Sequence, residues 1–143
     1  MSFELIPMYS PQAIINMWGT ITEGVEEVLK YTNGDSSKAK TFNEIMAGQV
    51  LLWVAYSDGQ YCGYMTTRID DIPTCYKCLS IIHVSVKDGK LKDLMLAKMS
   101  DLNEFAKSQG CSRLRMWTIR EVAFSKVLSD WHTGYHEVLK EVV

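Results

Sequence analysis

Apolar residues recur along the chain with two different spacings, which predict alternating strands and helices. A short apolar strand is expected at residues 3–7. From Ile14 to Leu29 apolar residues follow every three or four positions, the spacing of one buried helix face, with a break expected near Gly19 or Gly24. Ser10-Pro11 suits the start of this helix, because serine caps helix N-termini and proline favours the first turn. A second, shorter helix is expected to follow and to end near Ala47.

The middle of the chain predicts three consecutive strands. Residues 50–56 are mostly β-branched, aromatic or otherwise apolar, and Asp58-Gly59 predicts a hairpin turn into a partner strand at 61–69. Residues 70–73 are expected to form a loop. The third strand, 78–86, is apolar on both faces, which is typical of a central strand covered on both sides.

The last third of the chain predicts two further helix–strand pairs. A long helix is expected to end at Gly110, because glycine readily adopts the left-handed conformation found after helices. The expected elements are a helix at 91–108, a strand at 112–118, a short helix at 121–130 and a strand at 135–143. The order β-α-α-β-β-β-α-β-α-β predicts one α/β domain over residues 1–143, with a mixed sheet and helices on both of its faces.

The charge balance and hydropathy exclude some classes of partner. The chain has 15 basic and 17 acidic residues, a net charge of −2, whereas duplex-binding proteins usually carry a basic excess. The longest apolar run is far shorter than the roughly 20 residues that a transmembrane helix needs. No secretory leader is recognisable at the N-terminus. We therefore expect no nucleic acid partner, no membrane span and a cytoplasmic protein.

Several polar residues are candidates for chemistry, each with a structural alternative. Cys75 and Cys78 have the spacing of half a zinc site, but no second ligand pair follows, so no metal site is expected. His83 lies in the expected central strand, where it is either a hydrogen-bonded core residue or a general base. Asp70 and Asp71 are alternative bases, although a turn would also explain them.

Basic residues gather in two places, and each group is either a solvated face or a small-anion site. The first group is Lys87, Lys90 and Lys92; the second is Arg113, Arg115 and Arg120.

The order of elements resembles that of the GNAT superfamily of acyl-CoA N-acyltransferases, over nearly the whole chain. The strongest local match is F-A-K-S-Q-G-C-S-R-L-R-M at 105–116, where a helix ends in glycine and a strand follows at once. Three motifs are also similar to those of small acyltransferase-like proteins of tailed bacteriophages. They are S-P-Q-A-I at 10–14, G-C-S-R-L at 110–114 and K-V-L-S-D-W at 126–131.

The resemblance implies where acetyl-CoA would bind. The backbone of Ile82 and Val84 would contact the pantetheine, and the pyrophosphate would lie on the loop of Lys87, Gly89 and Lys90. His83 would be the base that deprotonates an amine. The family's loop pattern, Q/R-x-x-G-x-G/A, is kept only at Gly89. Val86 and Leu91 depart from the pattern, and Asp88 adds a negative charge to the loop.

Two functions remain open from the sequence. The degenerate loop, and the absence of the family's tyrosine from residues 127–130 of the expected last helix, favour a phage-type GNAT-fold protein with little or no catalysis. Such a protein would act in a virion or bind a host partner, and would be found in the host cytoplasm or the particle. The alternative is an active acetyl-CoA-dependent N-acetyltransferase that acts on a small amine or a protein lysine. The oligomeric state is left open.

Overall fold

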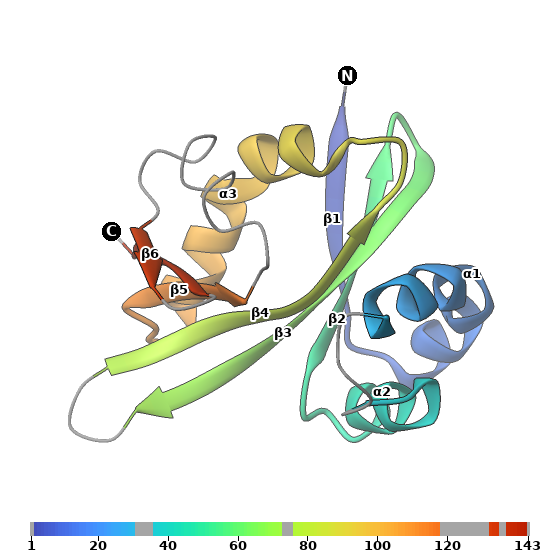
Figure 1. The fold of residues 1–143 in the computed structure, drawn as a ribbon, viewed down its shortest axis with the longest axis horizontal. Coiled ribbons are helices and arrows are strands. Elements are labelled where there is room, and N and C mark those ends of the chain that lie inside the picture. The colour runs from blue at the N-terminus through green and yellow to red at the C-terminus, as the bar shows by residue number, and fades with distance from the viewer. Residues whose placement is uncertain (1, 31–35, 73–75, 118–131, 135–136, 143) are drawn as a thin grey trace. The chain divides into compact units, whose positions relative to one another are not determined.

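The computed structural model describes residues 2–30, 36–72, 76–117, 132–134 and 137–142. Its elements, in chain order, are β1 (Phe3–Met8), α1 (Pro11–Leu29), α2 (Lys38–Met46), β2 (Leu51–Ser57), β3 (Gln60–Ile72), β4 (Tyr76–Val86), α3 (Leu91–Ser108), β5 (Arg113–Trp117), β6 (His132–Gly134) and β7 (Glu137–Glu141) (Figure 1).

The described strands form a mixed sheet in the order β1-β2-β3-β4-β5-β7-β6. β1, β2 and β3 pair antiparallel, β4 and β5 pair parallel, and β7 pairs antiparallel with both β5 and β6. The predicted α/β class and mixed sheet are confirmed. β4 is an inner strand, as its apolar pattern predicted.

The contacts divide the chain into two compact units. Unit 1 holds residues 1–67 and 83–91, and unit 2 holds residues 68–82 and 92–143. The first part of β3 and the last part of β4 therefore belong to unit 1, and the remaining parts of both strands belong to unit 2. That the two units form one domain over residues 1–143 stays a prediction.

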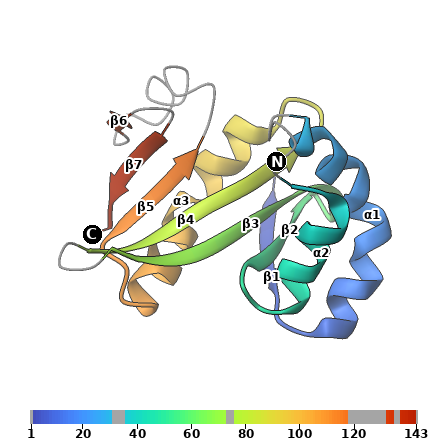
Figure 2. The ribbon, with the colours of Figure 1, turned by 60° about the horizontal axis from the view of Figure 1, so that its bottom comes forward.

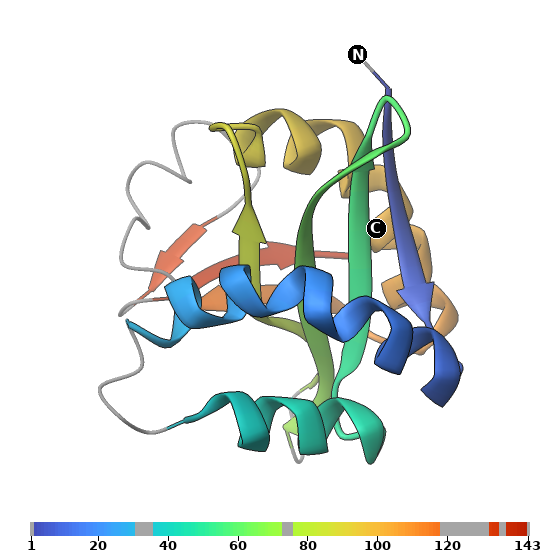
Figure 3. The same cartoon turned by 90° about the vertical axis from the view of Figure 1, so that its right-hand side faces the viewer.

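Unit 1 is built on the amphipathic helices α1 and α2, which lie against the strands β2 and β3 (Figure 3). The Ser10 hydroxyl caps α1 by accepting a hydrogen bond from the Ala13 amide at 3.4 Å. The α1 stripe is buried against one face of the strands, and the buried core comprises Ile14, Ile21, Val25, Ile45, Val50, Leu52, Val54 and Tyr64.

The expected break in α1 is wrong, because the helix runs without interruption from Pro11 to Leu29. Gly24 is instead a packing residue. A Cβ atom at Gly24 would lie 3.0 Å from Ser85 Oγ and 3.0 Å from Tyr64 Cε1, so glycine lets the helix approach the strands closely.

Unit 2 packs α3 against β4 and β5 (Figure 2). The buried side chains of this unit include Leu79, Ile81, Leu94, Met95, Leu102, Ala106, Leu114 and Met116. Gly110 follows α3 with a φ of 76°, and its amide donates to the Lys107 carbonyl, as expected for the end of a helix.

Three predicted boundaries change. β3 continues to Ile72, so Asp70 and Asp71 lie in a strand and the loop predicted from residue 70 is wrong. The final strand β7 ends at Glu141 although it was predicted to continue to residue 143, and the short strand β6 precedes it unexpectedly; residues 135–136 and 143 lie outside the described residues. The helix predicted at 121–130 lies outside the described residues. Among the described helices, none is long and apolar enough to cross a membrane.

Candidate functional site

The two halves of β4 differ in burial. Cys78 to Ile81 are buried, whereas every residue from Ile82 to Val86 is half-buried. Among the described residues, the parallel register with β5 extends to Ile81 and Met116, and β4 continues for five residues beyond that pair, from Ile82 to Val86. The predicted coverage of β4 on both sides therefore applies only to residues 78–81. Ile82 and Val84, predicted from the resemblance to contact pantetheine, both lie in the half-buried part.

His83 begins the part of β4 that belongs to unit 1. Its backbone amide donates to the hydroxyl oxygen of Thr66 on β3 at 3.1 Å. The ring Nδ1 atom is buried and has no hydrogen-bond partner among the described residues. His83 is thus held at its backbone, while its ring Nδ1 has no fixed proton donor or acceptor in the part of the chain that the structure describes.

Burial also sets the protonation of His83. Desolvation lowers the pKa of the imidazole below its usual value, and the nearby Glu44 carboxylate on α2 offsets only part of this effect. The ring is therefore mainly neutral at neutral pH. A neutral imidazole can accept a proton, which is the property that a general base needs.

A tight turn joins β4 to α3. The Lys87 amide donates to the Cys62 carbonyl on β3 at 2.7 Å, and the Lys90 amide donates to the Lys87 carbonyl at 3.2 Å. Asp88 and Gly89 have positive φ angles of 59° and 66°, as in a type I′ turn. Gly89 therefore has a backbone reason to be glycine. Asp88 adopts a conformation that aspartate tolerates better than most residues.

Two cations flank this turn. The Lys87 ammonium lies 5.3 Å from the centroid of the Tyr61 ring. Burial raises the pKa of Tyr61 to about 12, with smaller contributions from Cys62, Glu23 and Tyr56, so its hydroxyl stays neutral at neutral pH. Burial raises the pKa of the Cys62 thiol, and the charge of Lys90 opposes that change. Both lysines that were predicted to bind phosphate therefore lie beside the first residues of β3.

The alternative base Asp70 has a different environment. Its carboxylate accepts hydrogen bonds from Arg115 at 2.6 Å, from Ser80 at 2.6 Å and from Arg68 at 2.7 Å. Burial alone would raise its pKa, but these hydrogen bonds and the two positive charges outweigh burial and hold the pKa below its usual value. A carboxylate so firmly paired is a poor proton acceptor. Asp71 is exposed.

The second basic group and the cysteines have structural surroundings. Arg113 stacks over the Tyr76 ring at 4.0 Å and pairs with Glu141 at 3.1 Å, while Arg120 lies outside the described residues. Three cysteines are free and buried, namely Cys62, Cys78 and Cys111, and Cys75 lies outside the described residues. In the part of the chain that the structure describes, no group of three or more His, Cys, Asp or Glu side chains could hold a metal ion.

The structure adds two residues that sequence reasoning missed. Thr66 and Tyr61 both lie on β3; Thr66 contacts His83 inside β4, and Tyr61 contacts Lys87 directly after β4. Between these two β3 residues the strand carries Cys62 as an extra residue, where its register with β2 shifts between Ala55 and Tyr56. Hydrophobic alternation alone does not reveal such a bulge.

Comparison with known proteins gives matches only among solved structures. No protein-family model matches the sequence, and no curated protein matches it. The PaiA N-acetyltransferase of Thermoplasma acidophilum in complex with coenzyme A superposes with a TM-score of 0.64 at 18% identity, over 99% of both chains. Aminoglycoside 6′-acetyltransferase type Ii has a TM-score of 0.68 at 10% identity, over 100% of this chain and 98% of its own.

A third structure is an integron cassette protein from the mobile metagenome of V. cholerae. Its TM-score is 0.63 at 17% identity, over 94% of this chain and 88% of its own. Identities this low show the fold alone. The chain therefore has the fold of the GNAT acetyltransferases, as its order of elements predicted.

Proposed function

We propose that this protein is an acyl-CoA-dependent N-acyltransferase. The observation that carries the proposal is the half-buried second part of β4, which presents His83 and leads directly into the turn before α3. Structures of the same fold support it, because the T. acidophilum protein was crystallised with coenzyme A. The fold itself hosts many functions, so the proposal rests on these residues rather than on the fold.

The donor would lie along β4 and the turn that follows. The backbone of Ile82 and Val84 would bond the pantetheine amides, and the pyrophosphate would lie near Lys87, Gly89 and Lys90. The first amides of α3 have no partner within the helix, and the helix dipole favours negative charge at this end. Lys90 precedes α3 and cannot cap it, because its side chain has no hydrogen-bond acceptor.

His83 would supply the base. An amine is protonated at neutral pH and must lose a proton before its nitrogen can attack the thioester carbonyl. The neutral imidazole of His83 can take that proton, after which the carbon–nitrogen bond forms and the carbon–sulfur bond breaks. The released thiolate then takes up a proton. The stretch 127–130, where the family would place a tyrosine for that step, lies outside the described residues.

An acetyl-transfer assay tests this function. The protein is incubated with acetyl-CoA and a panel of amines that includes polyamines, aminoglycosides and lysine peptides, and free thiol is measured. The proposal requires that thiol is released only when one class of amine is present, and that the rate of release is lower in His83→Gln than in the wild type. Glu104→Gln is the matched control, since this exposed residue of α3 should leave the rate unchanged. Release at the uncatalysed rate with every amine would contradict it.

A non-catalytic role remains the second candidate. The observation that favours it is the turn itself, where Asp88 places a negative charge and the Lys90 amide is already bonded to the Lys87 carbonyl. On this proposal the protein would bind a phage or host protein, in the cytoplasm or the particle. Absence of any acetyl-CoA binding, together with a specific protein partner recovered from the source cells, would favour it.

A further inference from the structure

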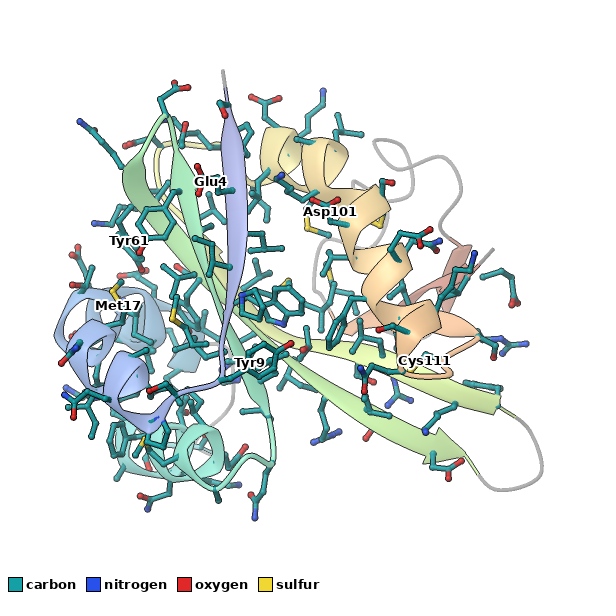
Figure 4. All side chains as sticks on the ribbon, turned by 180° about the vertical axis from the view of Figure 1, so that it is seen from behind. Glu4, Tyr9, Met17, Tyr61, Asp101 and Cys111 are labelled. Carbon is teal, nitrogen blue, oxygen red and sulfur yellow. The ribbon has the colours of Figure 1, made fainter. Side chains whose placement is uncertain are left out.

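Tyr61 is in contact with a cation that the proposed donor site needs. Its ring packs against the unit 1 core, and the Lys87 ammonium lies 5.3 Å from the ring centroid. Figure 4 shows Tyr61 on the side of the unit where Met17 of α1 lies. The backbone of Lys87 is fixed at the same time, because its amide donates to the Cys62 carbonyl at 2.7 Å.

These two contacts restrain Lys87 both at its backbone amide and at its side-chain ammonium. A free lysine loses considerable rotamer entropy when it binds a phosphate, and prior confinement reduces that loss. An aromatic face attracts an ammonium group within about 6 Å, and the ammonium keeps N–H donors that point away from the ring. Tyr61 remains neutral, so it offers Lys87 a ring face rather than a competing anion.

The turn between β4 and α3 is a poor phosphate site without an added positive charge. The family pattern places Gln or Arg before the loop and small residues within it, whereas this chain has Val86 and Leu91 at those positions. Asp88 brings a negative charge next to any bound phosphate. A cation held in place would offset that charge better than a mobile one.

We propose that Tyr61 is a positioning residue that holds the Lys87 ammonium for a phosphate of the acyl-CoA nucleotide. The inference rests on the proposed function. It implies that the contact between Lys87 and the Tyr61 ring increases the affinity for donors that carry phosphate. Tyr61 itself does not touch the reacting atoms.

Isothermal titration with three ligands tests the inference. Coenzyme A carries both a phosphorylated nucleotide and pantetheine, adenosine 3′,5′-bisphosphate carries a phosphorylated nucleotide without pantetheine, and pantetheine carries no phosphate. Tyr61→Leu should weaken binding of both phosphorylated ligands by about two- to fivefold, the size of one exposed cation–π contact. Binding of pantetheine should not change. Tyr61→Phe keeps the ring and should bind all three ligands like the wild type.

A double-mutant cycle and a matched control separate positioning from packing. Once Lys87→Met has removed the ammonium, adding Tyr61→Leu should cause no further loss. Tyr56→Leu removes a neighbouring tyrosine that packs on the same core, and it should leave the binding of phosphorylated ligands unchanged.

The outcomes distinguish this inference from the proposed function. If the wild type binds coenzyme A but Tyr61→Leu weakens pantetheine equally, or the two losses multiply in the double variant, Tyr61 is a packing residue and the inference is wrong. If the wild type binds none of the three ligands, the proposed function is wrong and the inference is wrong with it.

Discussion

Gly63 offers a sharp test of how β3 approaches the second half of β4. A Cβ atom placed on Gly63 would lie 2.8 Å from Val86 Cα and even closer to the Ser85 carbonyl oxygen. Real Cβ atoms essentially never come within 3.0 Å of such neighbours. Gly63 is not among the glycines with positive φ, so alanine meets a steric obstacle there rather than a backbone one.

The expected loss follows from what must move. Both contacts are with backbone atoms, so no side-chain rotation relieves them and the two strands must separate. Overpacking of this kind costs about 1–3 kcal/mol. We expect the upper part of that range for Gly63→Ala, reduced by roughly 0.4–1 kcal/mol because alanine restricts the unfolded chain. The net loss in the free energy of unfolding is therefore about 2 kcal/mol.

Urea denaturation measures this loss against a matched control. With an m value of about 1–3 kcal/mol/M, the midpoint should fall by roughly 1 M. The control is Gly19→Ala, because nothing lies within 4 Å of a Cβ atom at Gly19. In that exposed helical position alanine should stabilise the protein by about 1 kcal/mol.

The same pair of variants reports on the candidate site. Since Ser85 and Val86 belong to the half-buried part of β4, Gly63→Ala should also weaken acetyl-CoA binding, whereas Gly19→Ala should bind like the wild type. If Gly63→Ala unfolds at the wild-type urea concentration, the close approach of β3 to Ser85 is wrong.

Three further predictions concern the polar residues of the two strands. Asp70→Asn should lower the free energy of unfolding by about 1–3 kcal/mol, between the values for exposed and buried ion pairs. Because folding lowers the pKa of Asp70, the stabilisation from its carboxylate is complete above about pH 4 and is lost as the pH falls below that. The urea midpoints of the wild type and the variant should therefore converge in acid. Thr66→Val should destabilise by about 1–3 kcal/mol, because it leaves the His83 amide without this acceptor, while Thr66→Ser should restore the midpoint. The rate of acetyl transfer should rise with pH and level off above a pKa that is lower than the usual histidine value. His83→Gln should lower the rate by about 10²–10⁴-fold and remove that pH dependence. A pH profile that is unchanged in the variant would contradict the role of His83.

Much of the fold could be predicted because its local signals are strong. The apolar stripe that begins at Ile14 is buried as expected, and Ser10 caps the helix as its position predicted. Gly110 ends α3 with the positive φ that its place in the sequence indicated. These features depend on neighbouring residues, so hydrophobic spacing and turn chemistry suffice to find them.

The errors arose where distant residues decide the structure. Gly24 read as a helix break, yet the contact with Ser85 and Tyr64 makes glycine useful inside α1. The neighbours of Asp70 predict a turn, yet Asp70 lies in β3 and pairs with Arg115, which is 45 residues away in the sequence. The roles of Thr66 and Tyr61 likewise depend on which β4 residues lie beside them, and no local pattern encodes that.

The central claim is that acyl-CoA binds to this chain, and isothermal titration of the purified protein with acetyl-CoA tests it most directly. We expect saturable binding to one site with a dissociation constant in the range of about 1 μM to 1 mM that is typical of enzyme substrates. Lys87→Met should weaken that binding, and Gly19→Ala should leave it unchanged. An absence of binding heat at millimolar acetyl-CoA would contradict the claim and would direct the search toward a protein partner.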